Sequence, residues 1–131
     1  MNGYLVNIEE ETRRNKDFRR VLYTAPHSQL VLMSLRPKEE IGEETHELDQ
    51  FIRVEAGRGV AILDGVKREI SDGSAVVIPR GTRHNIVNVS GSEELKLYTL
   101  YSPPEHRDGT VHATKADAIA HEEHFDGKTT E

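Results

Sequence analysis

The sequence predicts an all-β domain, a sandwich or barrel of short antiparallel strands. Three observations support this fold class. Short apolar or alternating runs recur through the middle of the chain, Gly or Pro stands in nearly every gap between them, and an Asp-Gly pair joins two of the runs. Strands with this spacing favour a sandwich or barrel over alternating strands and helices, and the jelly roll is the antiparallel candidate.

The individual strands follow from these runs. Segment 29–35 (QLVLMSL) is almost continuously apolar, as expected for a strand covered on both faces. Segment 51–55 (FIRVE) alternates, which places Ile52 and Val54 on one face. The Asp64-Gly65 pair predicts a tight hairpin between two β-favouring runs. The other expected strands are 60–63, 66–70, 74–78, 84–89 and 95–101.

The two ends of the chain differ from its middle. Residues 9–16 carry mixed charges, and we expect either a short helix or an irregular loop there. After Pro103 and Pro104 the strand pattern stops, and Thr114 can cap a short helix over 115–120. We therefore expect a single domain over 1–131, with the barrel at about 18–102 and a C-terminal tail and helix at 103–126.

Composition restricts the expected partners and cofactors. The formal net charge is −6 and the basic residues are scattered, which argues against a nucleic acid or an anionic membrane as partner. Cysteine is absent, so a bound metal would need nitrogen and oxygen ligands. No apolar run approaches the roughly 20 residues that span a bilayer, and the N-terminus lacks a signal-peptide pattern. The default expectation is a cytoplasmic protein.

Segment 73–88 is the most informative part of the chain. Gly73, Pro79 and Gly81 would set the corners of a strand–turn–strand, and His84 would then point into the barrel from the returning strand. With Asn88, these residues match every fixed position of G-x5-P-x-G-x2-H-x3-N, so the chain resembles the cupin superfamily in its second signature. The resemblance implies that His84 is a metal ligand. The alternative is a histidine satisfied within the core.

The first cupin signature is present in altered form. Counting back from Gly57 by the spacing of that signature places Gln50 at the usual glutamate, and His46 at the second histidine. Glu44 then stands at the first histidine and Lys38 at the opening glycine. Glu44 and His46 are two residues apart and would point the same way on an extended strand. The alternative is that Glu44 is a solvated acid in the acidic stretch 39–47, with Gln50 bonded to the backbone.

The resemblance implies one divalent metal ion bound by Glu44, His46, Gln50 and His84. This set carries one formal negative charge, as does the usual cupin set of three histidines and one glutamate. Without Gln50, the set has the ligand types of non-haem iron(II) oxygenases. Zinc, manganese, nickel or copper could occupy the same residues, so the identity of the metal stays open.

More narrowly, the chain resembles small single-domain type-2 cupins, the bacterial proteins described as similar to mannose-6-phosphate isomerase. That resemblance implies a jelly-roll β-barrel with a short C-terminal helix, a small-molecule ligand and a homodimer. We expect a metalloenzyme with isomerase- or dioxygenase-type chemistry on a small polar or anionic substrate. The alternative is a non-catalytic cupin that senses a metabolite or sugar through its metal, because one fold hosts many functions. The segments that carry this narrower resemblance are 18–23, 49–55, 97–104 and 108–110.

Three further residues are candidates for contacts with the substrate. Arg53 could meet an anionic group if its side chain points inward. His106 and His112 follow the last expected strand, in a segment that could fold over the mouth of the barrel. The alternative for all three is an exposed position on the surface.

Overall fold

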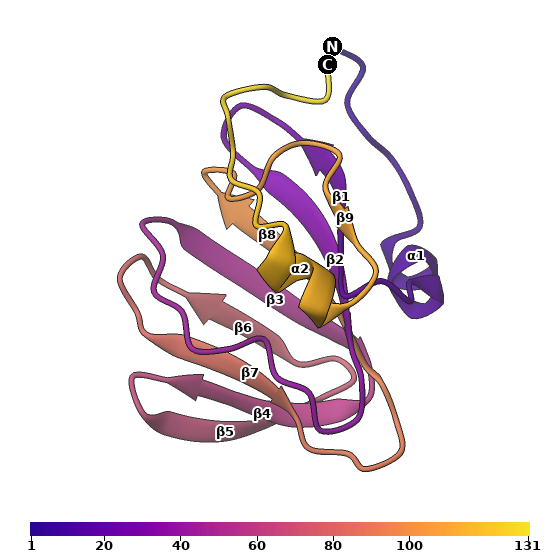
Figure 1. Ribbon diagram of the computed structural model, residues 1–131, viewed down its shortest axis with the longest axis vertical. Helices are drawn as coiled ribbons and strands as arrows, with labels where there is room; N and C mark the ends of the chain where they lie inside the picture. The colour runs from indigo at the N-terminus through magenta and orange to yellow at the C-terminus, as the bar shows by residue number, and fades with distance from the viewer.

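The predicted strands assemble into two antiparallel β-sheets that enclose an apolar core, a jelly-roll fold (Figure 1). The computed structural model describes residues 1–131. The larger sheet has the strand order β6-β3-β8-β2-β1-β9, and the smaller has the order β5-β4-β7. The strands are β1 (Arg19–Thr24), β2 (Gln29–Leu35), β3 (Asp49–Ala56), β4 (Arg58–Leu63), β5 (Val66–Ser71), β6 (Ala75–Ile78), β7 (His84–Asn88), β8 (Leu95–Ser102) and β9 (Val111–His112).

The alternation seen in the sequence determines which side chains fill the core. Ile52 and Val54 of β3 are fully buried on one face, as predicted, opposite Ile86 of β7 in the smaller sheet. Strand β2 has the predicted bounds, and every residue in it except Leu30 is buried. The Asp64-Gly65 hairpin is also confirmed, since both residues have positive φ and join β4 to β5.

Both ends of the chain form short helices. Helix α1 (Ile8–Arg14) begins after Asn7, whose side chain accepts a hydrogen bond from the Glu10 amide at 3.1 Å. Helix α2 (Lys115–Ala120) is confirmed with its cap, since the Thr114 hydroxyl accepts from the Asp117 amide at 3.1 Å. Neither helix is long and apolar enough to cross a membrane.

Strands β1 and β9 were not predicted from the sequence. β1 begins with two arginines and has no clear alternation, and β9 is only two residues long. Their pairing matters for the site because Arg19 lies opposite His112 and ties the C-terminal tail to the larger sheet. The tail then passes through α2, which lies in front of β2 and β3 in the view of Figure 1.

The buried side chain of Gln29 holds the start of this tail. Its amide nitrogen donates to the carbonyl of His106 at 2.7 Å, and its oxygen accepts from the His106 amide at 3.0 Å. Farther along, the Phe125 amide donates to the carbonyl of Glu105 at 2.9 Å. Gln29 therefore bonds the start of the tail to the barrel, and the Phe125–Glu105 bond ties the segment after α2 back to that start.

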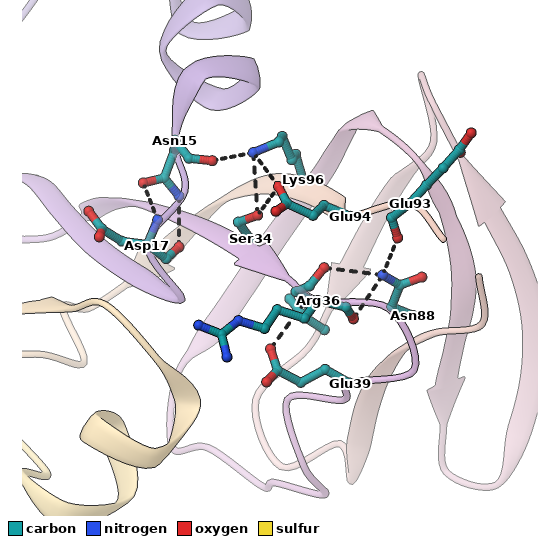
Figure 2. A network of polar contacts seen from close by, with 10 residues as sticks. Asn15, Asp17, Ser34, Arg36, Glu39, Asn88, Glu93, Glu94 and Lys96 are labelled. Carbon is teal, nitrogen blue, oxygen red and sulfur yellow. Dashed lines mark hydrogen bonds and ion pairs between the residues drawn. The ribbon is translucent and has the colours of Figure 1, made fainter. Parts of the chain in front are cut away.

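Asn88, the last residue of the second signature, closes the other end of the barrel. Its amide nitrogen donates to the carbonyls of Leu35, Arg36 and Glu93 at 3.1, 3.0 and 2.9 Å (Figure 2). The side chain is fully buried and joins the end of β2 to the turn before β8. Asn88 therefore has a structural role, and it lies on the same strand as His84.

Candidate metal centre

Backbone pairing places Glu44 next to His84. Glu44 lies in the long connection between β2 and β3 and forms an isolated antiparallel bridge to His84, the first residue of β7. Two hydrogen bonds of 2.9 Å join the two backbones in both directions. The carbonyl of His46 accepts from the Gly81 amide at 2.9 Å, at a glycine with φ of 83° in the turn before β7. The glycine turn of the second signature thus brings the altered first signature against His84.

The side chains of Glu44, His46 and His84 converge on one point. One ligand atom from each lies within 4.8 Å of the other two. Glu44 Oε2 and His46 Nε2 are 2.6 Å apart, and the rings of His46 and His84 are 5.3 Å apart. A carboxylate and two imidazoles at this separation are suitable ligands for a divalent first-row metal. The cluster could therefore hold one metal ion.

Hydrogen bonding leaves one nitrogen of His84 available for a metal. His84 Nδ1 lies 2.9 Å from the carbonyl oxygen of Thr82, which can only accept, so Nδ1 carries the proton. Nε2 then has its lone pair available for a metal. On the far side of His46, Nδ1 lies 3.7 Å from Oε2 of Glu105. A carboxylate behind a histidine ligand fixes the ring and strengthens it as a ligand.

Electrostatic interactions keep Glu44 ionised. Burial opposes ionisation, but the hydrogen bond from His46 and the positive charges of His46, Arg19 and His84 outweigh it and lower the pKa of Glu44. Burial likewise opposes protonation of His46, yet the hydrogen bond to Glu44 and the charges of Glu44 and Glu105 raise its pKa. Glu44 is thus present as the carboxylate that a metal needs. The Nε2 atom of His46 must release its proton before it can bind the metal.

Gln50 points into the same interior. Its side chain is 4% exposed and donates to Thr99 Oγ1 at 3.0 Å, while Oε1 is buried with no hydrogen-bond partner. A buried amide oxygen without a donor or a cation beside it costs free energy of folding. A bound metal ion would supply that partner. Gln50, Glu44, His84 and Tyr101 line one small interior cavity. The residues present thus fit a metal ion at this position.

A larger cavity of about 450 Å³ opens beside the cluster. Glu44 and His46 form its inner wall, while the C-terminal tail contributes Glu105, His106 and α2. His106 is buried against Tyr101, with ring centroids 5.2 Å apart, and burial lowers its pKa to about 3. The segment after the last long strand therefore does fold over the mouth of the barrel.

Two other expected substrate contacts lie elsewhere. Arg53 is on the face of β3 opposite to Gln50 and Ile52, half exposed, with Nε 3.4 Å from Glu55 Oε1. The inward orientation that its assignment required is not found, because side chains alternate along a strand and Ile52 occupies the inner face. His112 is buried in β9, where Nε2 lies 2.9 Å from the carbonyl of His121. It lines a second surface depression with the tail and not the cavity of Glu44.

Three cavity residues were not singled out from the sequence: Arg19, Tyr101 and Glu105. Burial raises the pKa of Glu105, with the charge of Glu44 acting in the same direction. Burial also raises the pKa of Tyr101, which is therefore a neutral hydroxyl. Their spacing along the chain carries no signal. Arg19 and Glu105 meet the cluster only through the β1–β9 pairing and the fold of the tail, and Tyr101 meets it because β8 pairs with β3 and places Tyr101 opposite Gln50. The two prolines before Glu105 are the one local sign that the chain turns there.

The fold and the cluster define the class: a jelly-roll barrel with a candidate metal centre of two histidines and one carboxylate in its interior. Residues 31–101 match the family described as Cupin domain, and the chain belongs to that family. The resemblance in the second signature is thereby confirmed.

Relatives agree with this assignment. The protein YrkC of Bacillus subtilis is 47% identical over 92% of this chain and 68% of its own length. The crystal structure of BH2720 from Bacillus halodurans is 48% identical, with a TM-score of 0.88 over 92% of this chain and 96% of that chain. KdgF from a Halomonas species, at 23% identity and a TM-score of 0.66 over 82% of this chain and 97% of its own, shares the fold.

Proposed function

We propose that this protein binds one divalent metal ion through Glu44, His46, His84 and Gln50, and acts on a small polar or anionic molecule in the adjacent cavity. The observation that carries the proposal is the convergence of one carboxylate and two imidazoles within 4.8 Å. The unpartnered oxygen of Gln50 supports it as the fourth ligand. A metal there would act as a Lewis acid or an oxygen-binding centre, which suits isomerase- or dioxygenase-type chemistry.

The residues of this chain would supply the rest of the chemistry. Glu105 faces the cavity with a raised pKa, so it holds a proton more readily than an ordinary carboxyl group and could pass it to a bound ligand. Tyr101 would offer a neutral hydroxyl as a hydrogen-bond donor. The tail from Glu105 to His124 would cover the ligand and exclude water. The size of the cavity, about 450 Å³, is suited to a small molecule.

Elemental analysis of the untagged protein tests the metal assignment. We expect about one metal per chain, lost in His46→Ala and His84→Ala and reduced in Glu44→Ala and Gln50→Ala. His27→Ala is the matched control, because His27 is exposed in the turn between β1 and β2. Wild-type protein that stays metal-free after reconstitution would refute the proposal, as would a metal content unaffected by His46→Ala and His84→Ala.

The second candidate is a non-catalytic cupin that recognises a metabolite or sugar through its metal. The observation that favours it is the number of ligands, since four protein ligands leave fewer coordination positions for reacting groups. Relaxation of water protons by the manganese-loaded protein distinguishes the two. Two or more exchangeable waters on the metal support catalysis, whereas none supports recognition alone.

A homodimer is proposed as the assembly. The outer face of the larger sheet carries Val77, which is 66% exposed, beside Phe51 and Tyr98, whose rings lie 6.3 Å apart. Val77 is exposed and Phe51 and Tyr98 are half-buried, and apolar side chains that adjoin on an outer sheet face form the kind of patch that marks an interface. Light scattering should give the mass of a dimer, and Val77→Lys should shift it towards the monomer. Val66→Lys, at an exposed valine of the smaller sheet, should leave the mass unchanged.

A further inference from the structure

Arg19 lies at the wall of the large cavity without an ionic partner. It is the first residue of β1 and lines the same cavity as Glu44, His46 and Glu105. The neighbouring Arg20 pairs with Asp17 at 2.8 Å, but Arg19 forms no ion pair. Its Nε is buried and has no hydrogen-bond partner. A guanidinium with an unsatisfied buried donor is costly unless an anion completes its bonding.

The surroundings hold the guanidinium in place and leave Nε and Nη2 without a protein partner. Its central carbon, Cζ, lies over the Phe18 ring at 5.4 Å from the ring centre, a cation–π contact. One terminal nitrogen, Nη1, lies 3.5 Å from Nδ1 of His112. His112 Nε2 faces the carbonyl of His121 and so carries the proton, which leaves Nδ1 as an acceptor for Arg19. The remaining in-plane donors are the ones that bind a carboxylate or phosphate in bidentate fashion.

The charge of Arg19 reaches the candidate metal centre. Arg19 lines the same cavity as Glu44 and His46 of that centre, so its guanidinium and the candidate ligands face one space. A divalent ion at Glu44, His46 and His84 would place a second positive centre on the same space. A small ligand between two positive centres is best matched if it has two separated oxygen-bearing groups, at least one of them anionic.

We propose that Arg19 is the anion-binding residue of this cavity, holding a carboxylate or phosphate group of a ligand whose other oxygen atoms contact the metal. This inference rests on the proposed metal site and adds the class of ligand to it: a small oxyanion. Lys115, at the start of α2, lines the same cavity and adds positive charge at its mouth.

Titration calorimetry of the nickel-loaded, untagged protein at low ionic strength tests the assignment, with malonate and inorganic phosphate as probes. Arg19→Gln should weaken binding of the better probe by about ten- to hundredfold, the usual loss for a hydrogen bond to a charged group. Arg19→Lys keeps the positive charge but not the planar set of donors, so its affinity for the probe should lie between those of the wild type and Arg19→Gln. Arg20→Gln removes the adjacent arginine outside the cavity and should bind as the wild type does.

A neutral probe separates anion binding from a general change in the site. Imidazole binds nickel without needing a positive side chain, so its affinity should be the same in wild type and Arg19→Gln. Nickel content should likewise stay at about one per chain in every variant. The probe that binds more tightly to the wild type identifies the group that Arg19 holds, a carboxylate if it is malonate and a phosphate if it is inorganic phosphate.

The outcomes distinguish this inference from the metal assignment on which it rests. Equal affinities of wild type and Arg19→Gln for both probes, with nickel bound normally, would overturn the role of Arg19 and leave the metal site standing. Failure of both probes to bind the nickel-loaded wild type would overturn it too. If the wild type binds no nickel, the metal assignment fails, and the same titrations on metal-free protein decide whether Arg19 binds the anion alone.

Discussion

Replacing His106 with phenylalanine should make the protein less sensitive to acid. His106 is 8% exposed, and burial is the main cause that lowers its pKa to about 3. In the unfolded chain a histidine has a pKa of about 6.5. Between those two values the unfolded chain binds a proton that the folded one does not. The free energy of unfolding therefore falls as the pH falls through this window, and it rises with pH.

The size of the effect follows from the two pKa values. Between about pH 7 and about pH 5, the unfolded histidine goes from mostly neutral to mostly protonated, while the folded one stays neutral. The linkage relation gives a loss of about 2 kcal/mol for this group alone. Phenylalanine removes the titration and keeps a ring against Tyr101. It gives up one long hydrogen bond, from Nδ1 to the Glu123 carbonyl at 3.4 Å, and Nε2 has none to lose.

Urea unfolding followed by circular dichroism measures this directly. Both pH values are compared in the presence of EDTA, so that release of metal does not contribute. His106→Phe should lose about 2 kcal/mol less than the wild type between them. His27→Phe, the same change at an exposed histidine, should keep the dependence of the wild type. An unchanged pH dependence in His106→Phe would refute the claim that this ring is held neutral by burial.

Three further predictions concern the backbone that supports the site, all measured by urea unfolding. Asn88→Ala leaves three carbonyls without their buried donor, so it should cost about 3 kcal/mol and shift the midpoint strongly. Lys38 has φ of 67° at the position where the first signature has glycine. Lys38→Gly should therefore be about 1 kcal/mol more stable than Lys38→Ala. Equal stabilities of the two variants would show that this backbone conformation costs nothing. Gly57 and Gly65 both have positive φ, but of the two only Gly57 has backbone, at Glu94, where an added methyl group would lie. Gly57→Ala should therefore lower the free energy of unfolding more than Gly65→Ala does. A larger loss in Gly65→Ala would contradict this contact.

The sequence was sufficient wherever local chemistry decides structure. Strand β2 and the Asp64-Gly65 hairpin were predicted because an apolar run and a two-residue turn each specify their own conformation. Helix α2 was predicted from its Thr114 cap, even though its apolar face is small. The spacing of the second signature likewise predicted the position of His84, because a fixed turn length fixes where the returning strand begins.

The rest of the site depends on contacts between distant segments. Counting residues placed Glu44 at a signature position. Its side chain lies beside that of His84, however, because an isolated backbone bridge pairs these two residues, which are forty positions apart in the sequence. Arg19 and Glu105 reach the cavity from opposite ends of the sequence, and no spacing rule connects them. Arg53 shows a different limit. Alternation along a strand assigns each side chain to one of two faces, but it does not say which face lines the interior when both are partly covered.

The cavity has two walls of unequal stability. Glu44 and His46 are held by backbone bonds to the barrel, whereas the facing wall consists of the tail and α2, a helix of six residues with Ala118 as its one buried side chain. Segments with little buried apolar surface open more readily than the core does. Part of the apparent affinity for a ligand is therefore set by how much of the time the tail is closed. Substitutions that loosen its bonds to Gln29 would weaken binding while leaving every ligand-contacting side chain intact.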